Sequence, residues 1–186
     1  EKNNKRIIKT QSNKEIIIKF ASLWREKLQS KIIAITGSNG KTTSKELLFH
    51  ILDNKYNCNK SSGNYNSTIG LPLSLLSCKT DHQYIILELG ANKRGEIKKL
   101  CDIVKPDYSL ITNISNAHIK NYNSLEEISE NKAEIFHSLS KKEGIAFINL
   151  NDKEIKKIPI KCKSVSYGID NNKAKFNGIN TSNNVL

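Results

Sequence analysis

The sequence predicts an α/β fold in which a mostly parallel sheet carries helices on both faces. Short segments that are almost wholly apolar alternate along the chain with segments whose apolar residues recur at helical spacing. Near-continuous apolar strands are typical of a sheet buried on both faces, and helices between them join the strands in parallel. A glycine-rich turn after the first strand fits the same class, whose sites lie at the carboxyl ends of the strands.

The expected elements follow in order. We expect strands at 31–36, 83–89, 108–114, 145–150 and 163–167, and helices at 13–29, 42–53, 96–104 and 124–139. The first helix is predicted from the spacing of Ile16, Ile17, Phe20, Trp24 and Leu28. The second is predicted from an apolar face of Leu47, Leu48, Ile51 and Leu52. Ser124 and Glu127 form a capping box before the last helix. The polar tail beyond about residue 170 is expected to fray.

Composition restricts the classes of partner. The chain has 30 Lys+Arg against 18 Asp+Glu, a formal net charge of +12, which favours nucleotides, acidic substrates or nucleic acid. The lysines are scattered rather than clustered, so we expect compositional bias and no nucleic-acid partner. No apolar run is long enough to span a bilayer, and no signal peptide or C-x-x-C pair occurs. We therefore expect a cytoplasmic protein and, because the sequence contains no Met, a piece of a longer chain.

The turn after the first strand predicts a phosphate-binding loop. It consists of Gly37, Ser38, Asn39, Gly40, Lys41, Thr42 and Thr43. Glycine lets backbone N–H groups approach a phosphate closely, and the following helix adds its positive N-terminal dipole. Lys41 would supply charge to the β- and γ-phosphates, and the Thr42 hydroxyl would bind Mg²⁺. Ile35 stands where the general P-loop has its first glycine, so the loop has a compact form.

Three further side chains are candidates, each with a plainer alternative. Glu88 ends a strand beside Gly90, where a metal ligand is needed, or it is a surface carboxylate. His118 lies in a polar loop after a strand and is either functional or solvated. Lys132 interrupts an otherwise apolar helical stripe. Its amine either snorkels to water or reaches a site and reacts with CO₂ to form a carbamate that can bind Mg²⁺.

The motifs together resemble the Mur ligase family. They are TGSNGKTTSKELL, GNYNSTIGLPLSLL at 63–76, ILELGANKRGEI at 86–97, TNISNAHI at 112–119, ENKAEIF at 130–136 and INLND at 148–152. The segment ELGANKRGEI is similar to the type that adds D-alanyl-D-alanine. The resemblance covers about residues 31–170 and implies the P-loop NTPase-like central domain of that family.

The resemblance implies roles for the matched residues. The phosphate loop would hold ATP and Mg²⁺, and Glu88, His118 and a carbamylated Lys132 would bind two Mg²⁺ ions with Thr42. Lys41, Lys132 and His118 would be catalytic. Asn149 would lie near the adenine. Asn64 and Asn66 would lie in a segment that faces nucleotide or substrate. The resemblance does not indicate which of the two residues contacts the ligand.

The resemblance also implies a reaction and a domain plan. ATP would activate the carboxylate of UDP-N-acetylmuramoyl-tripeptide as an acyl phosphate, and D-alanyl-D-alanine would then attack it. We expect residues 1–30 to be a linker or remnant of a UDP-sugar domain with one helix. Residues 31–186 would be an incomplete central domain without its C-terminal neighbour, in a monomeric enzyme. The alternatives are a sister Mur or folylpolyglutamate-type ligase, or a nucleotide-binding fragment without turnover.

Overall fold

A computed structural model describes residues 12–116, 122–139 and 143–178. Its strands form one sheet in the order β2-β3-β1-β4-β5-β6-β7, and every neighbouring pair is parallel. The strands are β1 (Lys31–Thr36), β2 (Cys58–Lys60), β3 (Tyr84–Glu88), β4 (Tyr108–Ile111), β5 (Ile145–Asn149), β6 (Lys163–Ile169) and β7 (Phe176–Gly178). The predicted α/β class is confirmed.

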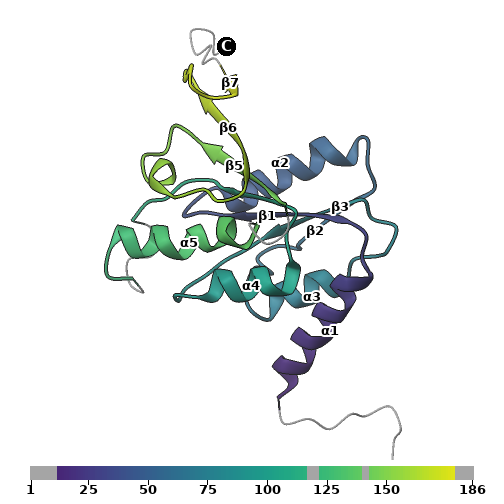
Figure 1. The fold of residues 1–186 in the computed structure, drawn as a ribbon. Helices are drawn as coiled ribbons and strands as arrows, with labels where there is room; N and C mark the ends of the chain where they lie inside the picture. The colour runs from purple at the N-terminus through teal and green to yellow at the C-terminus, as the bar shows by residue number, and fades with distance from the viewer. Residues whose placement is uncertain (1–11, 117–121, 140–142, 179–186) are drawn as a thin grey trace, which may run out of the picture.

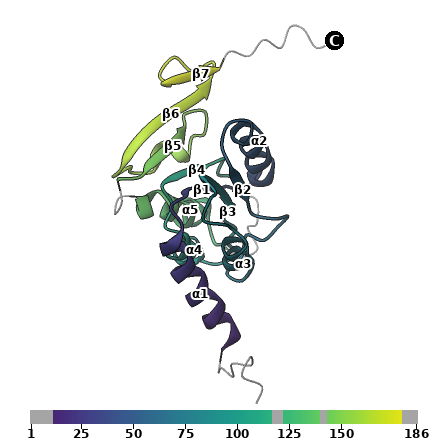
Figure 2. The ribbon, with the colours of Figure 1, turned by 90° about the vertical axis from the view of Figure 1, so that its right-hand side faces the viewer.

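Helices cover both faces of this sheet, as Figure 1 shows. One face carries α2 (Lys41–Asp53), and the other carries α3 (Gly70–Leu76), α4 (Glu96–Val104) and α5 (Leu125–Leu139). The two layers lie on opposite sides of the strands in Figure 2. A 3-10 turn, η2 (Ile155–Lys157), follows β5. None of the helices in the described ranges is long and apolar enough to cross a membrane.

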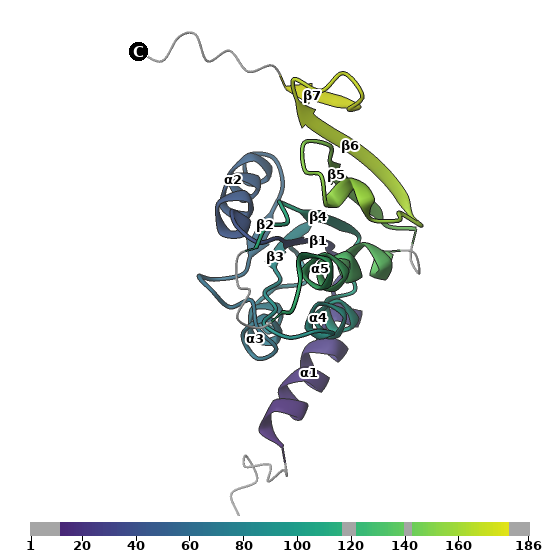
Figure 3. The ribbon, with the colours of Figure 1, turned by 90° about the vertical axis from the view of Figure 1, so that its left-hand side faces the viewer.

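The hydrophobic core lies mainly between the sheet and the α3–α4–α5 layer. Alternate residues of one strand point to opposite faces, so Ile32 and Ala34 join this larger cluster whereas Ile33 and Ile35 face α2. The smaller cluster under α2 contains Ile33, Ile35 and Ile86, with partly buried Leu48 and Leu52 against them. Beyond the helices, β6 and β7 extend the sheet away from this core (Figure 3).

Helix α1 (Asn13–Lys27) packs against α3 and α4. Arg25 is buried and donates hydrogen bonds to the Val104 carbonyl at 2.6 Å and the Lys105 carbonyl at 3.2 Å. It also pairs with Asp107 at 3.3 Å. The last carbonyls of a helix lack partners within the helix, so the Arg25 guanidinium caps the C-terminus of α4 and joins this helix to α1.

Two predicted helix faces are confirmed only in part, by Leu48 and Leu52 of α2 and by Trp24 and Leu28 at the end of α1. Leu47 and Ile51 are 59% and 68% exposed, whereas Lys45 of the same helix is buried. The apolar residues of α2 surround more than one face, so their spacing does not select the buried one. In α1, Phe20 is 53% exposed while Ala21 and Arg25 are buried. Arg25 makes its hydrogen bonds to the Val104 and Lys105 carbonyls from this inward face.

Most expected elements are confirmed with ends that differ by a few residues. The largest difference is β4, which ends at Ile111 rather than residue 114 because the chain then turns toward the phosphate loop. The short elements β2, α3 and β7 are not among those that the sequence predicts. Strand β7 lies in the tail that the sequence predicts to fray, and it pairs with β6 through backbone hydrogen bonds that polar side chains do not prevent.

Candidate functional site

The phosphate loop connects β1 to α2 at the carboxyl edge of the sheet. Gly37 has φ of 153°, and a Cβ atom there would lie 1.8 Å from the Thr112 hydroxyl oxygen. Gly40 has φ of 75° and precedes the first turn of α2. A glycine has no side chain to cap the helix, so the first-turn amides stay available to an anion. The local conformation therefore fits the predicted loop.

The segment after β4 fastens this loop from one side. The Ser38 amide donates to the Asn113 carbonyl at 2.9 Å, and the Ser38 hydroxyl donates to the Ser115 carbonyl at 3.0 Å. The Thr112 hydroxyl donates to the Asn39 carbonyl at 2.6 Å. Thr112, Asn113 and Ser115 are site residues that the sequence reasoning missed. The available signal is their place directly after the strand beside β1, at the edge where such folds build their sites.

Lys41 and the two threonines occupy the start of α2. The Lys41 ammonium donates to the carbonyls of Gly37 at 3.0 Å and Ser38 at 3.2 Å, so it lies across its own loop. Thr42 and Thr43 are exposed in the first turn. The predicted loop residues are therefore brought together with the charge facing the glycine turn.

Glu88 meets the phosphate loop, as its position at the end of β3 predicts. One carboxylate oxygen accepts a hydrogen bond from the Thr42 hydroxyl at 2.7 Å, and the other accepts from the Asn66 side-chain amide at 2.8 Å. The residue is 2% exposed. A hydroxyl beside a carboxylate offers the oxygen ligands that Mg²⁺ prefers. This geometry favours the metal-ligand interpretation of Glu88 over a surface carboxylate.

Lys132 shares a pocket with the phosphate loop. The pocket has a volume of about 210 Å³, and its lining consists of Gly37, Lys41, Asn66, Ser67, Thr68, Gly90, Ala91, Asn92, Glu96 and Lys132. Lys132 is 9% exposed, so the snorkelling alternative loses support. Desolvation, and next the nearby charge of Lys41, lower its pKa to about 8. Roughly a tenth of this amine is therefore neutral and nucleophilic at pH 7, far more than of an ordinary lysine.

The remaining predicted residues divide into three groups. His118 lies outside the described residues. The side-chain amide of Asn149 donates to the Thr112 carbonyl at 3.1 Å, which holds it at the carboxyl edge near the loop. Asn66 lines the pocket, whereas exposed Asn64 only accepts the Asn66 amide hydrogen through its carbonyl. In the described part of the chain, no three His, Cys, Asp or Glu side chains gather into a metal cluster.

A Gly37→Ala substitution should unfold the loop locally. The added methyl would overlap the Thr112 hydroxyl. This hydroxyl cannot move away without breaking its hydrogen bond to the Asn39 carbonyl. We expect a loss of about 2 to 4 kcal/mol in the free energy of unfolding, measured by denaturant titration, and loss of ADP binding. Gly95→Ala is the control: its φ is 79° but a Cβ atom there meets nothing within 4 Å. Equal effects of the two substitutions would contradict the overlap.

The pKa of Lys132 predicts a specific pH dependence of stability. A pKa lowered from 10.5 to about 8 in the folded chain means that the unfolded chain binds more protons between those values. Stability should therefore rise as pH increases from 8 toward 10.5. We expect a gain of about 2 kcal/mol between pH 7 and pH 10. Lys132→Met keeps the stem without the titrating group and should lack this gain; a parallel rise in both proteins would contradict the shift.

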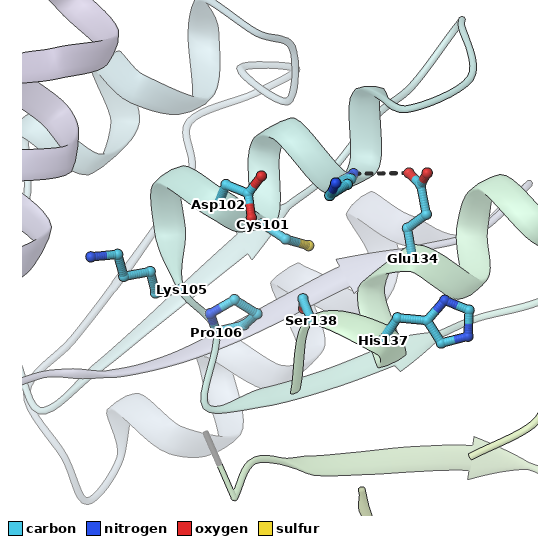
Figure 4. Close-up of a pocket in the computed structure, with 8 residues that line it drawn as sticks. Cys101, Asp102, Lys105, Pro106, Glu134, His137 and Ser138 are labelled. Atoms are coloured by element: carbon cyan, nitrogen blue, oxygen red, sulfur yellow. Dashed lines mark hydrogen bonds between the residues drawn. The ribbon is translucent and has the colours of Figure 1, made fainter. Parts of the chain in front are cut away.

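A larger cavity lies elsewhere, between α4 and α5 (Figure 4). It has a volume of about 570 Å³ and is lined by Lys98, Cys101, Asp102, Lys105, Pro106, Glu134, His137 and Ser138. These residues lie toward the ends of α4, which precedes β4, and of α5, which precedes β5, away from the phosphate loop. Burial raises the pKa of the Cys101 thiol to about 12, so it is a poor nucleophile at neutral pH. Cavity size alone does not indicate the site.

The fold and the loop define an α/β domain with a glycine-rich phosphate loop and a buried carboxylate, Glu88, beside the start of α2. Comparison with known proteins gives the family: the Mur ligase middle domain matches residues 35–185. The chain belongs to this family.

Relatives and solved structures agree with this assignment. The chain is 43% identical over 161 residues to the UDP-N-acetylmuramoyl-tripeptide–D-alanyl-D-alanine ligase of Rickettsia prowazekii, over 87% of this chain and 36% of the relative. It is similar to the Thermotoga maritima MurF ligase solved with ADP, at a TM-score of 0.81, 32% identity and coverage of 90% and 39% of the two chains. MurF from Acinetobacter baumannii gives a TM-score of 0.80 at 32% identity, over 88% and 38%. The chain thus spans little more than a third of these proteins.

Proposed function

We propose that the chain provides the ATP site of a ligase that adds D-alanyl-D-alanine to UDP-N-acetylmuramoyl-tripeptide. The observation that carries the proposal is the contact of Thr42 with Glu88 at 2.7 Å beside the phosphate loop, with Lys132 in the adjoining pocket. Relatives at 43% and 36% identity bear the name of that ligase. A cytoplasmic, monomeric enzyme of peptidoglycan precursor synthesis belongs to the same proposal.

The reaction has two chemical steps. An oxygen of the tripeptide carboxylate attacks the γ-phosphorus of ATP, and the bond from this phosphorus to the β,γ-bridging oxygen breaks. The products are an acyl phosphate and ADP. The amine of D-alanyl-D-alanine then attacks the acyl carbon, phosphate leaves, and the amine loses a proton. Negative charge develops on the transferring phosphoryl group, so fixed cations stabilise the transition state. Lys41, held across the loop, is the residue of this chain suited to that task.

The oxygen ligands at the loop fit Mg²⁺. Thr42 and Glu88 would hold one ion, and Glu88, His118 and modified Lys132 would hold a second. Mg²⁺ neutralises phosphate charge and is bound in proteins by one or two carboxylates together with phosphates. Asn66 keeps one Glu88 oxygen oriented by its hydrogen bond.

Lys132 would act as a carbamate. The neutral amine attacks the carbon of CO₂, a nitrogen–carbon bond forms, and one proton is released to solvent. The product is an anion, so it would attract rather than repel both Lys41 and a metal. A buried amine with a pKa of about 8 supports this chemistry, because an ordinary lysine amine is protonated at neutral pH.

Three further assignments belong to the proposal. Asn149 would contact the adenine from the end of β5. Residues 1–30 would form a linker with one helix, and residues 31–186 would belong to the central domain. The chain spans 36% of its Rickettsia relative, which favours a second candidate in which this chain alone binds nucleotide without completing the reaction.

A substrate-omission assay tests the proposed function. Phosphate release from ATP should require both UDP-N-acetylmuramoyl-tripeptide and D-alanyl-D-alanine, and single amino acids should not replace the dipeptide. The assay uses the complete ligase, and ADP titration of the 186-residue chain runs beside it. Phosphate release with glutamate in place of the dipeptide would favour a sister ligase. Absence of ADP binding by the chain would overturn the proposal.

A further inference from the structure

Lys45 is a fully buried lysine next to the site. It lies on α2, one turn after Thr42, and its exposure is 0%. A buried ammonium is costly unless all its hydrogens have partners. Here the nitrogen donates to the Ser61 carbonyl at 2.8 Å and the Gly63 carbonyl at 3.2 Å, and it pairs with Glu46 at 3.4 Å. Three acceptors for three hydrogens make the buried charge tolerable.

The two carbonyls belong to the segment 61–66, which connects β2 to the Glu88 carboxylate. At its start, the Ser61 hydroxyl accepts the backbone amide of Glu88 at 3.2 Å. At its end, the Asn66 side chain donates to Glu88 at 2.8 Å, and the Asn66 carbonyl accepts the Gly90 amide. Lys45 therefore contacts this segment at Ser61 and Gly63, before the segment reaches Asn66, its second point of contact with the end of β3.

Helix α2 thus influences both oxygens of Glu88. Thr42 contacts one oxygen directly. The other oxygen is held by Asn66, whose segment is tied to the same helix through Lys45. Partners that orient a metal-binding carboxylate commonly change metal affinity by about 10- to 100-fold when they are removed.

We propose that Lys45 is a positioning residue, which fixes the segment 61–66 so that Asn66 orients the Glu88 carboxylate for Mg²⁺ bound with nucleotide. The inference rests on the proposed function, because it assigns a metal to Glu88. It does not give Lys45 any contact with nucleotide or substrate. Its effect should therefore be on metal affinity and not on the phosphate loop.

The test measures Mg²⁺ and nucleotide binding separately in the 186-residue chain. A fluorescent ADP analogue is titrated in EDTA, and Mg²⁺ is then titrated into the saturated complex. In Lys45→Met, the Mg²⁺ concentration for half-saturation should rise about tenfold, while affinity for the analogue in EDTA stays within about twofold of the wild type. Thermal unfolding is recorded for every variant.

Lys60→Met is the matched control. Lys60 precedes this segment in the chain, and its side chain pairs with the same Glu46 and lies over the Phe49 ring. In the part of the chain that the structure describes, that side chain makes no hydrogen bond or ion pair with residues 61–66 or Glu88. It should leave the Mg²⁺ titration unchanged. A Lys45→Met protein with wild-type Mg²⁺ affinity, or one that loses nucleotide affinity in EDTA by the same factor, would overturn the inference.

Asn66→Ala keeps the test decisive if Lys45→Met folds poorly. It removes the contact with Glu88 and leaves the buried lysine in place, so it should reproduce the weakened Mg²⁺ binding. In the double variant the two effects should not add, because both act through one contact. Additive effects, or normal Mg²⁺ binding in Asn66→Ala, would contradict the inference. If Mg²⁺ had no effect on nucleotide binding by the wild-type chain, this result would contradict the proposed function itself.

Discussion

Replacing Lys41 with alanine should lower turnover of the complete ligase by about a thousandfold. The ammonium lies 3.0 Å from the Gly37 carbonyl and 3.2 Å from that of Ser38, so it is held across the loop proposed to bind the phosphates. A preorganised charge acts mainly on the transition state, so kcat should fall more than nucleotide affinity. Phosphate release with all three substrates measures the effect.

Lys55→Ala is the control for lost positive charge. Lys55 follows the last turn of α2 and is exposed, and it should retain wild-type turnover. If Lys41→Ala kept activity within a few-fold of the wild type, or if both variants lost activity equally, the loop would not have the assigned role.

Replacing Lys132 with alanine should lower turnover by about a hundredfold, and added formate should restore part of the loss. The side chain shares the pocket with Lys41, so a small anion bound there would take the place of the proposed carbamate. Formate is small enough for the space that the lysine stem leaves, and it has the carboxylate oxygens that Mg²⁺ needs.

Lys132→Arg separates a carbamate from a simple positive charge. Arginine remains protonated and does not form the carbamate, so this variant should be as inactive as Lys132→Ala. Full activity of the arginine variant, together with no response of the alanine variant to formate, would rule out the carbamate.

The fold is largely predictable because its signals are local. Strands such as β1 and β3 are short apolar runs, and their buried pattern leaves little choice of class. Strands β2 and β7 escape prediction because each has only three residues and depends on pairing with a distant neighbour. The buried face of α2 is not predictable in the same way, because its apolar residues do not form one narrow stripe.

The site is predictable where a residue conflicts with its pattern. Lys132 interrupts an apolar stripe and Glu88 ends a predicted strand, so both are visible as candidates, although only the family resemblance gives them a role over the plainer alternatives. Lys45 gives no such signal. Its partners are the carbonyls of Ser61 and Gly63, which any sequence carries. Every residue has a backbone carbonyl, so the residue types do not reveal which carbonyls the folded chain brings to Lys45.

A crystal structure of the chain grown with ADP, Mg²⁺ and bicarbonate tests the central claim most directly. We expect the phosphates over the amides that follow Gly37, a metal between Thr42 and Glu88, and added density on the Lys132 nitrogen. Nucleotide bound in the cavity between α4 and α5, or a metal that contacts neither Thr42 nor Glu88, would contradict the account.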